Sequence, residues 1–233
     1  MKSLLVGLFF LVSMTAVAAP DLLMVAMGGH TSCGLGELPP IGSKLYRPFT
    51  EWVSALRRDF PDRKFRQLTL CFNEGLPPDA DMVGIDSEDP RTVFVEDGHG
   101  LVKRIDDLAK SRQTQVILLG HSYGGYLAMF LAANLQRKVE GLFSIDPIGP
   151  NCEGAGGLFS GACEEAPTDL NNKAIRERTR VWVNIYQTQD WLHSSEIAEA
   201  ENILMSYRGP HNQIHIDPKT WHAIDLHVRN LVR

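Results

Sequence analysis

The stretch LLGHSYGGYLAMF, residues 118–130, holds a serine with a glycine two positions away on each side. The apolar residues before it predict a short buried strand, and the apolar residues after it predict a helix. Ser122 therefore falls on a tight strand-to-helix turn. The backbone of such a turn is unfavourable for most residues, so the chain needs Gly120 and Gly124 to pass without a clash. The pattern predicts a serine hydroxyl displayed above the end of a sheet; the alternative is a glycine-rich turn with an incidental serine.

Strands and helices alternate along the rest of the chain. Short apolar runs bounded by turn residues predict strands at residues 22–27, 65–72, 116–119, 142–145, 181–186 and 202–205. Apolar residues at helical spacing predict helices at residues 49–60, 101–109, 123–135 and 221–231. This alternation predicts an α/β fold, a three-layer sandwich built on a mostly parallel sheet.

The N-terminus predicts a secretory signal peptide over residues 1–19, removed from the mature chain. Lys2 gives a positive start, residues 4–12 are apolar, and Ala16-Val17-Ala18 is a small-residue cleavage signal. The apolar run is shorter than the roughly 20 residues that span a bilayer. Residues 20–233 suit a single domain, which we expect to be secreted or periplasmic. The net charge of −5, with no basic stripe, argues against a nucleic-acid partner.

The four cysteines predict disulfide bonds. An even number in an exported protein indicates two bridges, although four reduced, buried thiols are the alternative. Cys152 and Cys163 bracket a glycine-rich stretch and would form a local bridge. Cys33 and Cys71 follow or end predicted strands, so they could meet along one edge of the sheet. No CxxC pair is present, so a metal site is not expected.

Two long segments interrupt the alternation of strands and helices. Residues 73–97 are rich in acidic side chains and have no helical period, and residues 149–168 are rich in glycine. Each follows the C-terminal end of a predicted strand, where open α/β sheets bind their ligands. We expect both segments to be loops that form a rim or cap over a site.

The turn around Ser122 resembles the α/β-hydrolase superfamily of serine hydrolases, in particular its lipase and esterase branches. The resemblance covers most of the mature chain in the order of its elements, but matching of individual residues is confined to a few motifs. It implies a catalytic serine, then an acid, then a histidine along the chain, with no cofactor. It also implies a small-molecule or lipid ester as substrate. The chain has no room for two antiparallel strands before its first strand, so the fold would be a trimmed version.

The resemblance directs attention to two histidines and two aspartates after Ser122. His211 follows the last predicted strand, where the superfamily has its base, and His215 is the second choice. Asp146 lies 24 positions after the serine in a segment similar to that of pancreatic-type lipases, and is favoured as the acid. Asp190 follows the next strand, which is the commoner position in the superfamily, and stays an alternative. Each aspartate could instead cap loop amides at a strand end.

The same resemblance implies an oxyanion hole made of backbone amides. One N–H would come from Tyr123 and the other from Gly29 or His30. These features predict a secreted serine hydrolase that cleaves carboxyl esters through an acyl-enzyme. Two other functions stay open: a secreted binding protein that keeps the fold without turnover, and a thioesterase or acyltransferase.

Overall fold

The structure is a computed structural model. It describes residues 21–29, 32–33, 44–72, 79, 81–111, 113–149, 166–206 and 209–233. The predicted signal peptide, His30, the predicted pair Cys152 and Cys163, and most of the expected loop at 149–168 lie outside the described residues.

An eight-stranded sheet forms the centre of the fold, in the order β4-β3-β2-β1-β5-β6-β7-β8. Six neighbouring strands, from β2 to β8, run parallel; β3 is antiparallel to β2, and β4 to β3. The predicted α/β fold with a mostly parallel sheet is therefore confirmed. The strands are β1 (Leu22–Met27), β2 (Phe65–Phe72), β3 (Met82–Asp86), β4 (Asp89–Glu96), β5 (Gln115–His121), β6 (Val139–Ile145), β7 (Thr179–Tyr186) and β8 (Glu201–Leu204).

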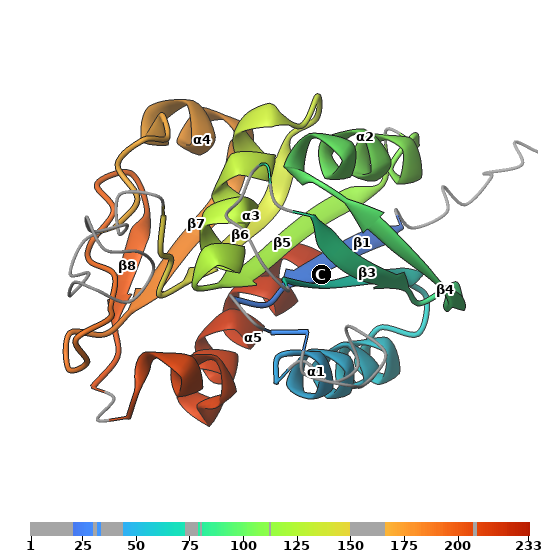
Figure 1. Cartoon of the computed structure of the whole chain (residues 1–233). Coiled ribbons are helices and arrows are strands. Elements are labelled where there is room, and N and C mark those ends of the chain that lie inside the picture. The colour runs from blue at the N-terminus through green and yellow to red at the C-terminus, as the bar shows by residue number, and fades with distance from the viewer. Residues whose placement is uncertain are drawn as a thin grey trace, which may run out of the picture.

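Helices cover both faces of the sheet (Figure 1). Those on one face are α2 (Gly98–Leu108), α3 (Tyr123–Asn134) and α4 (Asn172–Arg178), and those on the other are α1 (Tyr46–Asp59) and α5 (Pro218–Val232). A 3-10 helix, η2 (His211–Ile216), precedes α5. The sheet thus separates two apolar cores, one beneath α2 and α3 and one beneath α1 and α5.

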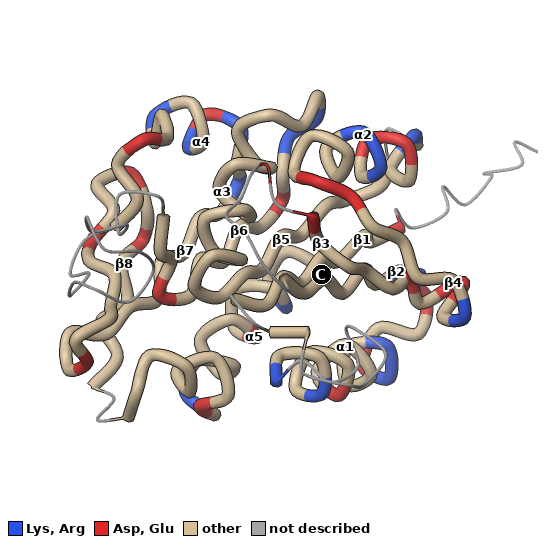
Figure 2. Tube along the Cα trace, in the orientation of Figure 1, with Lys and Arg blue, Asp and Glu red and all other residues tan. Residues whose placement is uncertain are grey.

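The apolar sequence of the central strands explains this layering. All residues of β1 are buried, and successive side chains enter opposite cores: Leu23, Val25 and Met27 face α3, whereas Leu22, Met24 and Ala26 face α1. The first ten residues of α3 are also buried, as expected for a helix that is apolar all round. Charged residues lie mainly on the outer helices and connections, and β1 and β5 carry none (Figure 2).

The prediction of a loop over residues 73–97 is wrong for residues 82–96, where β3 and β4 form a hairpin; residues 73–78 and 80 lie outside the described residues. The hairpin lies at the edge of the sheet, and among the residues of β4 only Phe94 is buried. An exposed edge strand tolerates polar side chains at most positions, so no apolar run marks it in the sequence. Arg66 on β2 forms an ion pair with Asp86 of this hairpin at 2.6 Å. Some of the segment's acidic residues are therefore structural.

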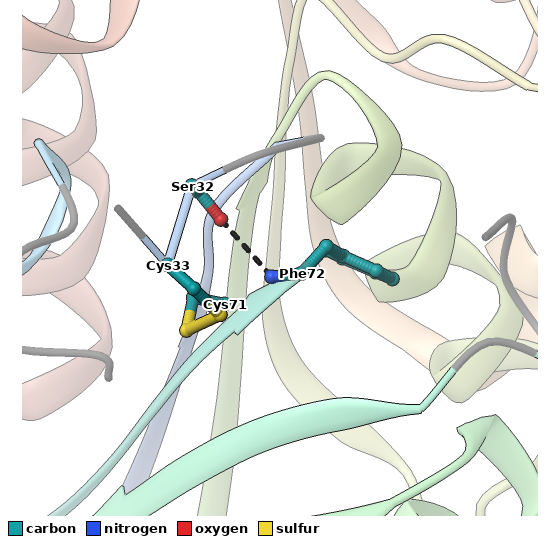
Figure 3. Close-up of a disulfide and its surroundings, with 4 residues drawn as sticks. All are labelled: Ser32, Cys33, Cys71 and Phe72. Atoms are coloured by element: carbon teal, nitrogen blue, oxygen red, sulfur yellow. Dashed lines mark hydrogen bonds between the residues drawn. A yellow bond between two sulfur atoms is a disulfide. The ribbon is translucent and has the colours of Figure 1, made fainter. Parts of the chain in front are cut away.

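A disulfide joins Cys33 to Cys71, so the predicted pairing of these two cysteines is confirmed (Figure 3). It ties the segment after β1 to the end of β2, and both cysteines are buried. Two hydrogen bonds reinforce the link: the Phe72 N–H donates to Ser32 Oγ at 3.1 Å, and the Cys33 N–H donates to the Phe72 carbonyl at 3.2 Å. The chain that leaves β1 is therefore fastened to β2.

Replacing both cysteines with alanine (Cys33→Ala with Cys71→Ala) is expected to destabilise the protein by about 4 kcal/mol. The bridge closes a loop with a sequence separation of 38 residues, and opening it restores chain entropy to the unfolded state. The melting temperature should fall by roughly 10 °C in a chain of this size. Thermal unfolding followed by circular dichroism measures the change. Ser32→Ala removes only a hydrogen bond in the same segment and serves as control; an equal, small loss in both variants would contradict the prediction.

Candidate active site

Ser122 and Asp146 lie side by side at one end of the sheet. Ser122 follows β5 and Asp146 follows β6, and the last residues of these parallel strands, His121 and Ile145, are paired. The Ser122 N–H donates to the Ile145 carbonyl at 3.0 Å. Topology alone therefore brings the serine and the first candidate acid to the same edge, at the C-terminal ends of the strands.

The backbone of both residues is strained. Ser122 has a φ of 58° and Asp146 a φ of 45°, and no other non-glycine residue in the described ranges has a positive φ. Such conformations are uncommon for residues with a Cβ atom, and they concentrate at functional sites, where the surrounding structure holds them. The two strained positions coincide with the serine and the favoured acid of the sequence analysis.

Close packing around the turn accounts for its glycines. A Cβ atom on Gly120 would lie 1.9 Å from the carbonyl oxygen of Gly124, and one on Gly124 would lie 2.2 Å from that of Met27. Both positions therefore exclude any side chain, as the turn predicts. Ser122 is the N-cap of α3, but its side chain makes no capping bond, so helix capping does not occupy the hydroxyl.

The imidazole of His211 is bonded to the carboxylate of Asp146. His211 Nδ1 donates to Asp146 Oδ2 at 2.8 Å, and Asp146 is fully buried. The Ser194 N–H donates to Oδ1 at 2.7 Å, and Gln187 Nε2 donates to Oδ2 at 3.2 Å. Because Nδ1 carries the proton in this arrangement, Nε2 of the neutral ring is a proton acceptor.

Nε2 of His211 is buried and has no hydrogen-bond partner within the described ranges. The serine–imidazole hydrogen bond implied by the resemblance is therefore not formed in this structure. In unliganded enzymes such bonds are often long and shorten when substrate binds. Asp146 thus fixes Nδ1 of the ring, while Nε2 has no bond to a described residue.

Asp190 contacts the backbone of His211 and not its ring. Its Oδ2 accepts the His211 N–H at 2.5 Å, and its Oδ1 accepts the Trp191 N–H at 2.8 Å. This is the loop-capping role that the sequence analysis gave as an alternative for each aspartate. Asp190 therefore holds the start of η2, while Asp146 orients the imidazole.

Backbone amides approach Ser122 from two sides. Tyr123 is the first residue of α3, so its N–H lies in the helix turn that follows the serine. Gly29, two residues after β1, packs against the serine: a Cβ atom on it would lie 2.8 Å from Ser122 Cβ and 3.3 Å from Oγ. His30, the other candidate donor of the sequence analysis, lies outside the described residues.

A protein-family model described as the alpha/beta hydrolase family matches residues 15–201. The chain belongs to the alpha/beta hydrolase family. None of the curated proteins compared with the sequence matches it.

Solved structures similar to this alpha/beta hydrolase include esterase PE8, with 11% identity, a TM-score of 0.48, and coverage of 92% of this chain and 94% of that chain. SOBER1 from Arabidopsis thaliana has 11% identity and a TM-score of 0.46, covering 91% and 100%. Est1E from Butyrivibrio proteoclasticus, with ferulic acid bound, has 12% identity and a TM-score of 0.49, covering 90% of both chains.

Three histidines of this alpha/beta hydrolase stack at the site. The ring of His121 lies 4.7 Å from the ring of His211 and 4.1 Å from that of His215, with interplanar angles of 32° and 35°. Burial, together with the His215 and His211 rings, holds the pKa of His121 well below its ordinary value. Burial, His211 and Lys44 lower the pKa of His215 to about 4. The rings of His121 and His215 therefore stay neutral near pH 7.

Sequence reasoning missed the neighbours that support the Asp146–His211 pair. Gln187 and Ser194 lie in the connection after β7, where no periodic pattern marks them. His121 precedes Ser122, so the chain order does not select it as the base, although its place inside the motif is a signal of proximity. His215, the second-choice base, has a buried Nδ1 without a partner, and no carboxylate in the described ranges bonds to it.

The free energy of unfolding of this alpha/beta hydrolase is expected to fall as the pH drops from about 6.5 to about 4. The unfolded chain protonates His215 below about 6.5, whereas the folded protein protonates it only near pH 4, so acid favours the unfolded state. Once the pH is below both pKa values, the protonation of His215 has lowered the free energy of unfolding by about 3 kcal/mol. Urea unfolding of wild type and His215→Leu, at neutral and at acid pH, measures it.

The comparison between the two proteins isolates His215, because His121 and the carboxylates titrate in both. We expect the His215→Leu protein to lose less stability on acidification than wild type, by up to about 3 kcal/mol. Equal losses in the two proteins would show that His215 is not buried in its neutral form.

The described parts of the chain contain neither a metal-binding cluster nor a membrane-spanning helix. No group of three or more His, Cys, Asp or Glu side chains there could hold a metal ion. No helix there is long and apolar enough to cross a membrane.

Proposed function

We propose that this alpha/beta hydrolase is an exported serine hydrolase that cleaves carboxyl esters of small molecules or lipids. The observation that carries the proposal is the hydrogen bond from His211 Nδ1 to the carboxylate of buried Asp146. Ser122 supports it, because its strained turn follows the strand next to that of Asp146. A nucleophile, a base and an orienting acid are the groups that acyl transfer requires.

In the proposed first half-reaction, His211 Nε2 takes the proton of Ser122 Oγ as the oxygen attacks the ester carbonyl carbon. The negative charge that develops on the carbonyl oxygen is stabilised by the N–H of Tyr123 and an N–H from Gly29 or His30. His211 then gives its proton to the departing alcohol, and the acyl group stays on Ser122 Oγ.

In the second half-reaction, water replaces the alcohol. His211 takes a proton from the water as its oxygen attacks the acyl carbon, and the tetrahedral species again places its charge on the backbone amides. Collapse breaks the bond to Ser122 Oγ, which regains its proton from His211. Asp146 stabilises the imidazolium formed in each half-reaction; its hydrogen bonds from Ser194 and Gln187 keep the carboxylate oriented.

Export is part of the proposal because two independent features support it. The predicted signal peptide over residues 1–19 directs secretion. The Cys33–Cys71 disulfide is a bond that persists in oxidising compartments.

A non-catalytic binding protein is the second candidate, and one observation favours it: His211 Nε2 makes no hydrogen bond to Ser122 or to any other described residue. A panel of p-nitrophenyl esters of increasing acyl length separates the two functions. We expect wild-type turnover well above that of Ser122→Ala. No turnover of any ester, by either protein, would favour the binding function.

The same panel separates ester hydrolysis from thioester hydrolysis and acyl transfer. Acyl-CoA and alcohol acceptors are added to parallel reactions. We expect the free acid from p-nitrophenyl esters to be the main product. Faster turnover of acyl-CoA, or a predominance of the new ester over the free acid, would make the chain a thioesterase or an acyltransferase.

A further inference from the structure

His121, the residue before Ser122, is engaged with His211 through both its ring and its Nε2. Its ring stacks on that of His211, and its Nε2–H donates to the His211 carbonyl oxygen at 3.0 Å. The side chain is buried, with 5% of its surface exposed, and its ring also packs against that of His215. Neither the strand β5 nor the turn at Ser122 needs an imidazole at this position for its own backbone bonds.

Three groups from three strand ends hold His211. Asp190, after β7, accepts its backbone N–H at 2.5 Å; Asp146, after β6, accepts its ring Nδ1–H at 2.8 Å; and His121, at the end of β5, donates to its backbone carbonyl at 3.0 Å. Among the polar atoms of His211, only Nε2 is without a partner in the described residues. Every polar group of His211 is therefore fixed, except the one that would exchange protons with substrate.

The segment that carries His211 needs such support. His211 is the first residue of the short 3-10 helix η2, and the residue before it, Pro210, makes no side-chain cap bond. Short 3-10 helices have poor hydrogen-bond geometry and little intrinsic rigidity. A displacement of the ring by about 1 Å is enough to reduce catalysis by about 100-fold. The contact with His121 fixes the carbonyl at the start of this helix.

We propose that His121 is a positioning residue for the base His211, holding its backbone and ring so that Nε2 stays directed at the nucleophile. The inference rests on the proposed function. His121 is not itself the base, because its Nε2 carries the proton donated to the carbonyl. The groups that face it are His211, His215 and Lys44, all cationic or able to become so, and they disfavour a charge on His121. A neutral neighbour therefore remains when His211 takes up a proton.

Two substitutions separate the donor from the ring. His121→Phe keeps a stacking ring but leaves the His211 carbonyl without its donor. His121→Gln lacks the ring but has an amide Nε2 the same number of bonds from Cα, so it can donate to the same carbonyl. We expect His121→Phe to lower kcat by about 10- to 100-fold, with KM changed by less than about threefold. His121→Gln is expected to recover about tenfold of that loss.

The pH profile of kcat/KM distinguishes a positioning role of His121 from a purely structural one, because a purely structural role would leave the profile unchanged. A misaligned His211 ring is less well stabilised by Asp146 when protonated. The acid limb of kcat/KM should therefore shift to lower pH in His121→Phe and return towards the wild-type position in His121→Gln. His227→Phe is the matched control: His227 lies on α5, 6.3 Å from the Phe143 ring, and is expected to leave both kcat and the profile unchanged.

Each outcome decides something. A wild-type kcat and pH profile in His121→Phe would overturn the inference but not the proposed function. A His121→Gln protein with a kcat no higher than that of His121→Phe would do the same. Absence of turnover in wild type would overturn the proposed function, and the inference with it. If His121→Phe does not fold, ¹⁵N NMR of the wild-type imidazoles decides: the inference requires His121 as the neutral Nε2–H tautomer near pH 7, and an Nδ1–H tautomer overturns it.

Discussion

Replacing Ser122 with alanine is expected to abolish ester hydrolysis while leaving the fold intact. The hydroxyl is the group that carries the acyl chain in the proposed mechanism, and removal of such a nucleophile lowers turnover by roughly 10⁴- to 10⁶-fold. Stability should change little. Alanine keeps the Cβ atom, so the strained φ of 58° costs the same as with serine, and the serine side chain makes no capping bond.

Steady-state hydrolysis of the best p-nitrophenyl ester measures this loss, with circular dichroism to establish that the variant is folded. Ser54→Ala is the matched control, because Ser54 donates only to the Thr50 carbonyl within α1, away from the strand ends. Turnover by Ser122→Ala within about tenfold of wild type would remove Ser122 from the mechanism.

The second large effect is expected from Asp146→Asn, a loss of about 10⁴-fold in turnover. Asparagine keeps the shape of the side chain, but its amide would donate to His211 Nδ1. The proton of the neutral ring would then move to Nε2, which could no longer accept the proton of Ser122. The loss should appear in kcat, because the change does not touch the substrate.

Asp190→Asn is the matched control for Asp146→Asn. An asparagine oxygen still accepts the His211 backbone N–H, and only the bond from the exposed Trp191 N–H is lost, so we expect a loss of less than about tenfold. Kinetics of the two variants side by side decide between the acids. A loss in Asp190→Asn larger than in Asp146→Asn would assign the acid to Asp190 and reverse the interpretation of the two contacts.

The fold was predictable where the sequence is uniformly apolar. The strands at residues 22–27 and 65–72 match β1 and β2 to the residue, and the element before Ser122 was recognised with its helix. Uniformly apolar stretches of this kind are typical of parallel strands buried on both faces and of fully buried helices. The hairpin of β3 and β4 was missed because its residues are largely solvated, and α4 and η2 because they are too short for a clear period.

The site was predictable in composition but not in geometry. The motif and the chain order selected Ser122, His211 and two aspartates, and spacing could not decide between the aspartates because β6 and β7 end side by side. Only coordinates distinguish a carboxylate that contacts a ring from one that contacts a backbone amide. The catalytic roles of these residues stay a proposal.

Two further features, the disulfide pairing and the contact of His121 with His211, could be established only from the three-dimensional structure. Disulfide connectivity does not follow from a count of cysteines, although both cysteines of the observed bridge fall near the ends of strands. The contact of His121 with His211 joins residues 90 positions apart, and nothing in the local sequence distinguishes it from any other histidine in a buried turn. Long-range contacts between single polar side chains leave no periodic trace.

The central claim is that the Ser122 hydroxyl is made nucleophilic by the His211–Asp146 pair. Reaction with a fluorophosphonate, followed by digestion and mass spectrometry, tests it most directly, because the reagent captures serines activated in this way. We expect one adduct, on Ser122, that forms in wild type and is lost in His211→Ala. An adduct on another serine, or none in a folded wild-type protein, would contradict it.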